Sequence, residues 1–578
     1  MVGGLGNRHM RVKRRTESKR IKINRFYVVL VSWAISLLPI APIAPVAAVD
    51  QSIGAAGIEA DKLHQAPYNL SGQGIYVGQI ELNRPTRFGM DKIVNRLVQL
   101  DRKMVEPFGV FSRDRDAIPN RFIDDHSEQV AAVIISTNKI YQGVAPKARL
   151  LSSAYAMSRR DGQPEAALAA QHIARQHGGI RAMNLSFGEP LSEDPRPDAT
   201  LNGEALLTLC LDWLTIKYNT LAVVAGNQGK GGIPIPTDHY NGLTVGFTRQ
   251  IDGVYSQLDR GNLIDESYID RDNNGSFDEG EYFEDLNQDE TWTAGVESPI
   301  NGRRSLSILA PGTDIDLPNI KGKVTTISGS SFAAPHVTGA IALLQEYSDR
   351  QIASGVWGKE ARNHLVTKAV LLNAADKLKD DGSGKRLGMS KTIIDQQGKT
   401  WVDTPAYRNQ QIPLSLHLGA GQLNAMRAFR QLEPGRQMPG LVPPIAWDQN
   451  LIKVNSYREY SFDRPLQADS YVAITLTWDR LVQLQEQDKT TQRNGLFDLG
   501  DRFEGADLSN LDLYLMPKDA QDLEQSVWAS TSKIDNVEHI FIKIPQTGEY
   551  KFRVVFKTPQ ASVPVQTYGV AWWAVPVN

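Results

Sequence analysis

A stretch of small residues runs directly into an apolar segment with helical character at residues 327–345, ISGSSFAAPHVTGAIALLQ. Proline is tolerated in the first turn of a helix, where backbone N–H groups have no intrahelical partner. Those N–H groups also attract negative charge. Ser331 could therefore cap the helix, or it could be a nucleophile whose oxyanion forms at the helix N-terminus. The second possibility needs a base, an orienting acid and another oxyanion donor elsewhere in the chain.

Four other segments carry residues that could form or support such a site. The segment VGQIE ends at Glu81, and VVAGN ends at Asn227. His126 leads the amphipathic run in DDHSEQVAAVI, and MNLSFG ends at residues 186–188. Each has an ordinary structural alternative, namely a surface acid for Glu81, a helix cap for His126 and a turn for Asn227. Taken singly, these residues make a hydrolytic site possible without establishing it.

The elements that must position these residues alternate along the chain from about residue 74 to residue 430. GIYVGQIEL, ARLLSSAYA, IRAMNLSFG and TLAVVAGN are typical of strands, whereas SEQVAAVIIS and PEAALAAQHIARQHGG are typical of helices. This alternation predicts an α/β fold with a parallel sheet. In such a sheet, chemistry gathers at the C-terminal ends of the strands. Glu81, Ser186 and Asn227 all stand at the ends of expected strands.

Together these motifs resemble those of the subtilisin-like serine peptidases. The family's nucleophile motif, Gly-Thr-Ser-Met-Ala-x-Pro-His-Val, corresponds to GSSFAAPHV at residues 329–337. Its histidine motif, His-Gly-Thr-His-Val-Ala, corresponds to HSEQVA at residues 126–131. Four shorter landmarks are intact: GVAP at 143–146, AGNQG at 225–229, APG at 310–312 and GAGQLNA at 419–425. The resemblance covers about residues 66–432, in the order acid, histidine, serine.

The resemblance implies a subtilisin-like parallel sheet flanked by helices, and a serine endopeptidase that works through an acyl-enzyme. By the motif match, Ser331 is the nucleophile, His126 the general base and Asn227 a donor to the oxyanion. Glu81 takes the place of the aspartate that orients the histidine. By the same resemblance, Ser186, Phe187 and Gly188 line the pocket for the residue before the cleaved bond.

Two departures from the family pattern bear on activity. Glu81 keeps a carboxylate but reaches one methylene further than aspartate, and Asp91, Asp124 and Asp125 are rivals by proximity in sequence. The histidine motif has also lost its glycine and its second histidine. Sedolisins look like relatives of the subtilisin-like peptidases, and they use a glutamate to orient the histidine. The alternative to an active peptidase is a catalytically impaired subtilisin-fold pseudopeptidase that acts as a binding or envelope protein.

An acidic insert at about residues 260–300 carries a candidate metal loop. The twelve residues from Asp270 to Glu281 place oxygen-bearing side chains at the positions that a calcium loop uses, with Gly275 at the sharp turn. The candidate ligands are Asp270, Asp272, Asn274, Ser276, Asp278 and Glu281. The alternative is a solvated acidic loop. The pattern predicts structural calcium, with no cofactor needed for catalysis.

The two ends of the chain differ from its middle. Residues 1–48 hold nine Lys or Arg, one Glu and an apolar run, which predicts a cleaved signal peptide, with an uncleaved membrane anchor as the alternative. A short N-terminal segment at 49–70 then precedes the catalytic domain at 71–430. The Pro- and Gly-rich residues 431–446 are expected to form a linker. Alternation in EYKFRVVF, LDLYLM and VAITLTW predicts a β-sandwich at 447–578.

Charge and cysteine content narrow the classes of partner. Removal of residues 1–48 would take the formal net charge from −2 to −10. An acidic protein is poorly suited to binding nucleic acid, which is itself negatively charged. We therefore expect protein or peptide substrates, no nucleic acid, no stable membrane span once the signal is cleaved, and a monomer. The expected location is secreted, either extracellular or periplasmic. The single cysteine, Cys210, lies in an apolar helical run and is expected to be a buried core thiol.

Overall fold

The computed structural model describes residues 48–86, 105–113, 115–156, 161–197, 199–226, 235–262, 268–272, 274–283, 285, 292, 299–487, 494–558 and 563–577. The expected signal peptide up to residue 47, the candidate oxyanion donor Asn227 and the rival acid Asp91 lie outside these residues. Contacts group the chain from Val46 onward into one compact unit. Within the described residues, no helix is both long enough and apolar enough to cross a bilayer.

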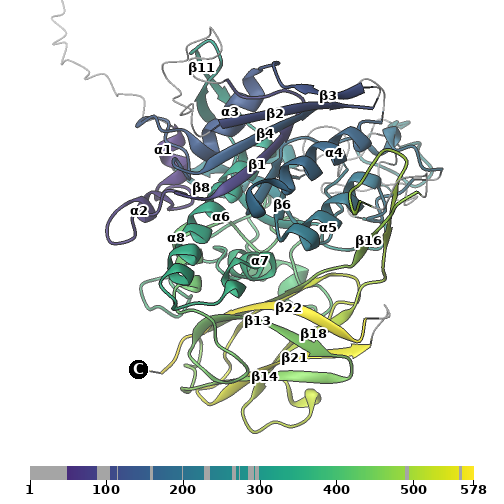
Figure 1. Cartoon of the computed structure of the whole chain (residues 1–578). Helices are drawn as coiled ribbons and strands as arrows, with labels where there is room; N and C mark the ends of the chain where they lie inside the picture. The colour runs from purple at the N-terminus through teal and green to yellow at the C-terminus, as the bar shows by residue number, and fades with distance from the viewer. Residues whose placement is uncertain are drawn as a thin grey trace, which may run out of the picture. The chain divides into compact units, whose positions relative to one another are not determined.

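A nine-stranded sheet forms the centre of the expected catalytic domain (Figure 1). Its strand order is β3-β2-β4-β1-β5-β6-β7-β8, and β9 also pairs with β7. The pairs β2–β3 and β7–β8 are antiparallel, and the other pairs are parallel. The bounds are β1 Tyr76–Glu81, β2 Val105–Ser112, β3 Arg115–Pro119, β4 Arg149–Tyr155, β5 Ala182–Leu185, β6 Leu221–Ala225, β7 Leu243–Ile251, β8 Val254–Leu258 and β9 Leu306–Pro311. The predicted α/β fold is confirmed.

Helices cover both faces of this sheet, which is why strands such as β6, LAVVA, are buried along their whole length. The helices are α3 Asp125–Ile135, α4 Gln163–Ala174, α5 Leu206–Tyr218, α6 Ser330–Ala353, α7 His364–Asn373 and α8 Ala425–Leu432. α3 and α6 share one core cluster, and α4 and α5 share another. On β1, Val77 packs with α3 and α6, whereas Ile80 packs with α4 and α5. Because strand side chains alternate, residues 79 and 81 face the side of α3 and α6.

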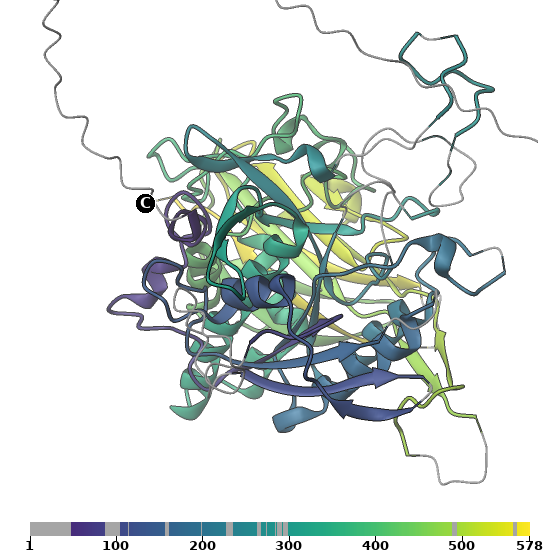
Figure 2. The ribbon, with the colours of Figure 1, turned by 90° about the horizontal axis from the view of Figure 1, so that it is seen from above.

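The short N-terminal segment belongs to the same core. It contains α1 Ala48–Ile53 and α2 Asp61–His64, which Figure 2 shows in purple against the rest of the unit. Ile53, Ile58 and Leu63 are buried in the cluster that includes α6. The Ser52 hydroxyl donates to Nε2 of His336 on α6, at 2.8 Å, because Nδ1 of that imidazole is held by the Phe332 carbonyl. The segment expected at residues 49–70 is thus an integral part of the fold.

Two further sheets make up the C-terminal part, and their inner faces share one core cluster. The predicted C-terminal β-sandwich is confirmed. One sheet has the order β12-β14-β21-β18-β19 and the other β13-β22-β15-β20. The bounds are β12 Gly440–Val442, β13 Ile445–Lys453, β14 Ser456–Phe462, β15 Tyr471–Trp478, β18 Asn510–Pro517, β19 Trp528–Ser530, β20 Val537–Lys543, β21 Tyr550–Thr558 and β22 Val565–Trp573. A hairpin of β16 Val482–Gln485 and β17 Arg502–Gly505 completes this part.

The junction between the two parts is packed. α7 lies directly against β15 and β22, and Figure 1 shows it next to β22. Trp447, Val537 and Ala571 join the core cluster of α3 and α6. The stretch 431–446, expected as a linker, contains the end of α8, all of β12 and the start of β13. Its prolines and glycines therefore separate short elements within one body, because composition of this kind marks turns whether or not they are exposed.

Candidate active site

Glu81 is the last residue of β1, and its side chain faces α3. Only 4% of that side chain is exposed, whereas 41% of the His126 side chain is exposed. His126 is the second residue of α3, and its Nδ1 lies 3.2 Å from Oε2 of Glu81. The additional methylene of glutamate is thus accommodated, with the carboxylate behind the imidazole and the rest of the imidazole open.

The electrostatics of the pair favour a proton on the imidazole. Burial raises the pKa of Glu81, and the charge and hydrogen bond of His126 oppose that rise. Burial lowers the pKa of His126, but the charge and hydrogen bond of Glu81 outweigh it, with help from Asp124. The net result is a His126 pKa above its ordinary value. The imidazole can therefore accept a proton near neutral pH, which is what a general base must do.

The two described rivals of Glu81 have other partners. Asp124 caps α3, because its Oδ1 accepts from the backbone N–H of Ser127 at 2.6 Å. Its Oδ2 accepts from Asn83 Nδ2 at 2.8 Å. Asp125 Oδ1 accepts from the N–H of Ile320 at 2.9 Å. These bonds fix the start of α3, and they leave Glu81 as the carboxylate on the His126 ring.

Ser331 lies in the first turn of α6. Gly329 precedes that helix with φ of 149°, a backbone conformation that side-chain-bearing residues rarely adopt. The ring of Phe332 lies edge-on to the His126 ring, with 5.6 Å between centroids, so the start of α6 adjoins the histidine. The Ser331 hydroxyl donates to the carbonyl of Ser186 at 3.3 Å. The structure thus brings Glu81, His126 and Ser331 to one edge of the sheet.

A proline links this serine to the expected substrate-binding segment. Pro335 is the sixth residue of α6, beyond the first turn in which prolines are readily tolerated. Because proline has no N–H, it cannot donate to the carbonyl of Ser331 four residues earlier. The hydroxyl of Ser186 donates to that carbonyl instead, at 2.8 Å. Ser186 and Ser331 are therefore joined by two hydrogen bonds in opposite directions, a feature the sequence analysis missed.

The remaining residues of the expected pocket wall are close by. Phe187 packs on Tyr155 at the end of β4, with ring centroids 4.8 Å apart, and Gly188 is exposed. Asn184 supports Ser186, because its Nδ2 donates to the Ser186 hydroxyl at 2.9 Å. The structure therefore places the expected wall segment beside Ser331. It does not describe Asn227, which follows the end of β6 by two residues.

The acidic insert brings together three of its four candidate carboxylates. Carboxylate oxygens of Asp270, Asp272 and Glu281 all lie within 4.8 Å of one another. Gly275 adopts a φ of 80°, as the sharp turn of a calcium loop requires. Phe277 stacks on Trp292 with centroids 4.8 Å apart, which anchors the loop to the rest of the insert. Oxygen donors around a tight turn are chemically suited to calcium.

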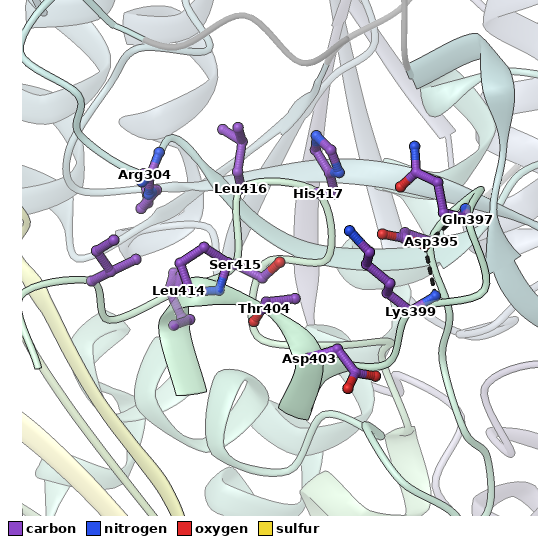
Figure 3. Close-up of a pocket in the computed structure, with 13 residues that line it drawn as sticks. Arg304, Asp395, Gln397, Lys399, Asp403, Thr404, Leu414, Ser415, Leu416 and His417 are labelled. Carbon is purple, nitrogen blue, oxygen red and sulfur yellow. Dashed lines mark hydrogen bonds between the residues drawn. The ribbon is translucent and has the colours of Figure 1, made fainter. Parts of the chain in front are cut away.

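A separate cavity of about 230 Å³ is lined by Arg304 and by residues between 395 and 417 (Figure 3). Figure 3 shows Arg304 on one side of it and Asp395, Lys399 and His417 on the other. Asp395 Oδ1 accepts from the backbone N–H groups of Gln397 and Lys399, so this carboxylate stabilises its own loop. No residue that lines the cavity is among the expected catalytic or substrate-binding residues. We assign it no part in the reaction.

Comparison with known proteins identifies a family and several relatives that this chain resembles. The pattern of the Subtilase family matches residues 93–390. Subtilisin Savinase of Lederbergia lenta is 25% identical over 255 residues, which are 43% of this chain and 72% of the relative. The major intracellular serine protease of Bacillus subtilis is 35% identical over 85 residues, which are 14% of this chain and 26% of the relative. The solved structure of patellamide maturation protease PatA covers 63% of this chain and 98% of its own, at 20% identity and a TM-score of 0.36.

The matched region contains His126 and Ser331, and Glu81 precedes it. Because the family pattern spans just over half of the chain, this protein belongs to the subtilase family of serine peptidases.

Proposed function

We propose that this serine-type endopeptidase cleaves peptide bonds with Ser331 as nucleophile, His126 as general base, Glu81 as orienting acid and Asn227 as oxyanion donor. The observation that carries the assignment is the 3.2 Å contact between His126 Nδ1 and Glu81 Oε2. A carboxylate in this position keeps the proton on Nδ1, so that Nε2 can take the proton of a serine hydroxyl. It also stabilises the imidazolium that forms.

The reaction would begin with rotation of the Ser331 side chain, because its hydroxyl donates to the Ser186 carbonyl in the free enzyme. Oγ then attacks the substrate carbonyl while His126 removes the hydroxyl proton. The carbon–nitrogen bond breaks as His126 passes that proton to the leaving amine. Water then attacks the acyl-enzyme by the reverse proton route, which releases the acid and restores Ser331.

A substrate would lie along the segment that holds the nucleophile. Ser186 contacts Ser331 through two hydrogen bonds, Phe187 packs on Tyr155, and Gly188 is exposed. An exposed glycine lets another backbone approach closely. We therefore propose this segment as one wall of the pocket for the residue before the cleaved bond.

The test is labelling by a fluorophosphonate probe, together with cleavage of denatured casein. Wild type should react with the probe and cleave casein, and Ser331→Ala should do neither. Ser348→Ala is the matched control, because Ser348 is a buried serine on the same helix whose hydroxyl has no partner among the described residues. Equal background cleavage by wild type and Ser331→Ala would refute the peptidase assignment and favour a pseudopeptidase that binds peptides.

We also propose that the insert binds structural calcium through Asp270, Asp272, Asn274, Ser276, Asp278 and Glu281. Four of these side chains are carboxylates, and their mutual repulsion makes a shared site unfavourable without a cation. A ligand that binds only the folded state adds about 2.7 kcal/mol of stability at a hundredfold excess over Kd. Calcium would thus hold the insert against the catalytic part.

Thermal melting with and without EGTA tests this proposal. EGTA should lower the melting temperature, and calcium should restore it better than magnesium, which keeps its waters. Asp270→Asn with Glu281→Gln should abolish the calcium effect, while Asp519→Asn with Glu524→Gln, two exposed acids of the C-terminal part, should preserve it. A melting temperature indifferent to EGTA, with no calcium in the purified protein, would show a solvated acidic loop.

The N-terminal residues support a proposal of export. A basic run followed by an apolar run at residues 1–48 is the pattern of a secretory signal. N-terminal sequencing of the protein recovered outside the cytoplasm should begin close to residue 49. Recovery of an intact N-terminus in the membrane fraction would instead identify an anchor.

A further inference from the structure

An amide side chain lies in β1 on the same face as the orienting acid. Gln79 precedes Glu81 by two residues, so strand alternation directs both side chains toward α3. Gln79 is 0% exposed. Its direct neighbours Gly78 and Ile80 carry no polar side-chain group. A buried amide in such a strand needs hydrogen-bond partners, because burial of an unpaired polar group is unfavourable.

The partner of this amide is the helix that carries the base. Gln79 Nε2 donates to the backbone carbonyl of Ser127 at 2.9 Å. Ser127 directly follows His126, and its own N–H is held by Asp124. The first turn of α3 is therefore fixed from two sides. Asp124 holds the N–H of the residue after the histidine, and Gln79 holds its carbonyl.

Glu81 depends on His126 for the support of its charge. Burial raises the pKa of Glu81, and the charge and hydrogen bond of His126 oppose that rise. Because Gln79 holds the helix turn that carries His126, it acts on the carboxylate through the position of the imidazole.

The acceptor end of the amide is not engaged. Gln79 Oε1 and Glu81 Oε1 are both buried, and neither has a hydrogen-bond partner among the described residues. The orientation of the amide therefore depends on its N–H group alone. Replacement of the amide by a group without N–H would release the carbonyl of Ser127 and leave Glu81 with less support.

We propose that Gln79 is a positioning residue that fixes the start of α3 relative to Glu81, so that Nδ1 of His126 meets the longer carboxylate. This inference rests on the proposed roles of Glu81 and His126. Gln79 touches no substrate. Its effect is on the geometry of the imidazole, and a displacement of about 1 Å at a catalytic group can lower the rate about a hundredfold.

The variants are Gln79→Leu and Gln79→Glu in the full-length chain. Leucine removes the amide, and glutamate keeps the shape while it removes the N–H and adds a second carboxylate beside Glu81. Gln345→Leu is the matched control. Gln345 is also a buried glutamine whose Nε2 donates a hydrogen bond, to Thr367 Oγ1 at 2.9 Å, and whose Oε1 has no partner in the described part of the chain.

Gln79→Leu should lower kcat about tenfold or more and leave KM within about twofold, because the substrate wall is untouched. Gln79→Glu should lower kcat further than Gln79→Leu does, because a second negative charge raises the pKa of Glu81. In a Ser331→Ala background, the low-field proton signal of His126 Nδ1–H should shift or vanish with Gln79→Leu and persist with Gln345→Leu. His126→Ala identifies that signal.

Two results would overturn the proposal. One is an unchanged kcat and an unchanged low-field signal in both Gln79 variants. The other is equal loss of kcat and melting temperature in Gln79→Leu and Gln345→Leu with the signal retained, which would show a purely structural glutamine. If wild type fails to cleave peptides but Gln79→Leu alone loses the signal, the proposed function fails and the positioning role stands.

Discussion

Two histidine–carboxylate pairs lie in two regions of the described part of the chain, and they differ in what surrounds the imidazole. At the edge of the catalytic sheet, His126 Nδ1 lies 3.2 Å from Glu81, and 41% of the histidine side chain is exposed. At the junction with the C-terminal sheets, His364 Nε2 lies 2.9 Å from Asp479, and 6% of that histidine is exposed. His364 Nδ1 also contacts Asn219 Oδ1 at 2.8 Å.

The difference shows that the pair itself does not make a catalytic base. Both nitrogens of His364 are engaged, so this imidazole joins α7 to the residue after β15 and can do no more. His126 has a carboxylate on one nitrogen, and among the described residues no partner occupies the other. A base needs one nitrogen held and one nitrogen open beside a hydroxyl.

The largest expected effect separates the two histidines. His126→Gln should lower kcat by on the order of 10⁶, the size known for the corresponding loss in subtilisin, with little change in stability. His364→Gln should keep kcat and lower the free energy of unfolding by about 2 kcal/mol, because Asp479 and Asn219 lose a buried partner. Casein cleavage and urea unfolding measure both. Loss of activity in a folded His364→Gln variant would contradict a purely structural role for His364.

The carboxylates of the two pairs, Glu81 and Asp479, should differ in the same way in their effect on kcat. Glu81→Gln should lower kcat about 10⁴-fold, as loss of the orienting acid does in other serine peptidases, because the imidazole then favours the wrong tautomer. Asp479→Asn should leave kcat unchanged. Steady-state kinetics of both variants, with Asp124→Asn and Asp125→Asn beside them, check this result. If Glu81→Gln kept full activity while one of those two lost it, the orienting role would pass to that aspartate.

The pH profile of kcat/KM should reflect the ionisation of His126. Since the His126 pKa lies above its ordinary 6.5, kcat/KM should fall on the acidic side with a midpoint above that value. Glu81→Gln removes the charge that raises the pKa, so the midpoint for its residual activity should shift to lower pH. By linkage, the stability gained from protonated His126 is full below pH 6.5 and is lost as pH rises through the folded-state pKa. An acidic midpoint unaffected by Glu81→Gln would contradict this coupling.

The smallest effect concerns a single hydroxyl at the junction. Thr475 Oγ1 donates to Asn373 Oδ1 at 3.0 Å and lies 2.8 Å from His539 Nδ1. Thr475→Val should lower the free energy of unfolding by about 1–2 kcal/mol, because buried polar groups lose a partner, and it should not alter kcat. Urea unfolding and casein cleavage provide the comparison. A fall in kcat at full stability would mean that the junction acts on the catalytic edge.

Local sequence was sufficient for the strands β1, β4, β5 and β6 and for the helices α3, α4 and α6, which carry or adjoin the candidate catalytic residues. Glu81 and Ser331 lie at element ends, where alternating strands and helices concentrate chemistry. His126 was distinguished by the acids before it and the amphipathic run after it. His364 also leads a helix, and its role depends on Asp479, which lies 115 residues further along the chain. Pairing over such a distance leaves no local signal.

The packed junction and the contacts behind the active site were not predicted, for a related reason. Proline and glycine in residues 431–446 indicate turns, and composition does not show whether two sheets bury the turns between them. The bond from Ser186 to the carbonyl of Ser331 joins residues 145 positions apart. Gln79 was within reach of sequence reasoning, because an amide two residues before a strand-end acid shares its face.

The missing N–H of Pro335 has a mechanical consequence for the peptide group of Ser331. A helical peptide group is normally tethered to its own helix, but here the Ser331 carbonyl is tethered to Ser186 on a different element. A displacement of the segment that contains Ser186 is therefore transmitted to the backbone of Ser331 through one hydrogen bond. If a peptide strand docks on that segment, as we propose, a displacement of Ser186 reaches the backbone of Ser331 without first deforming α6.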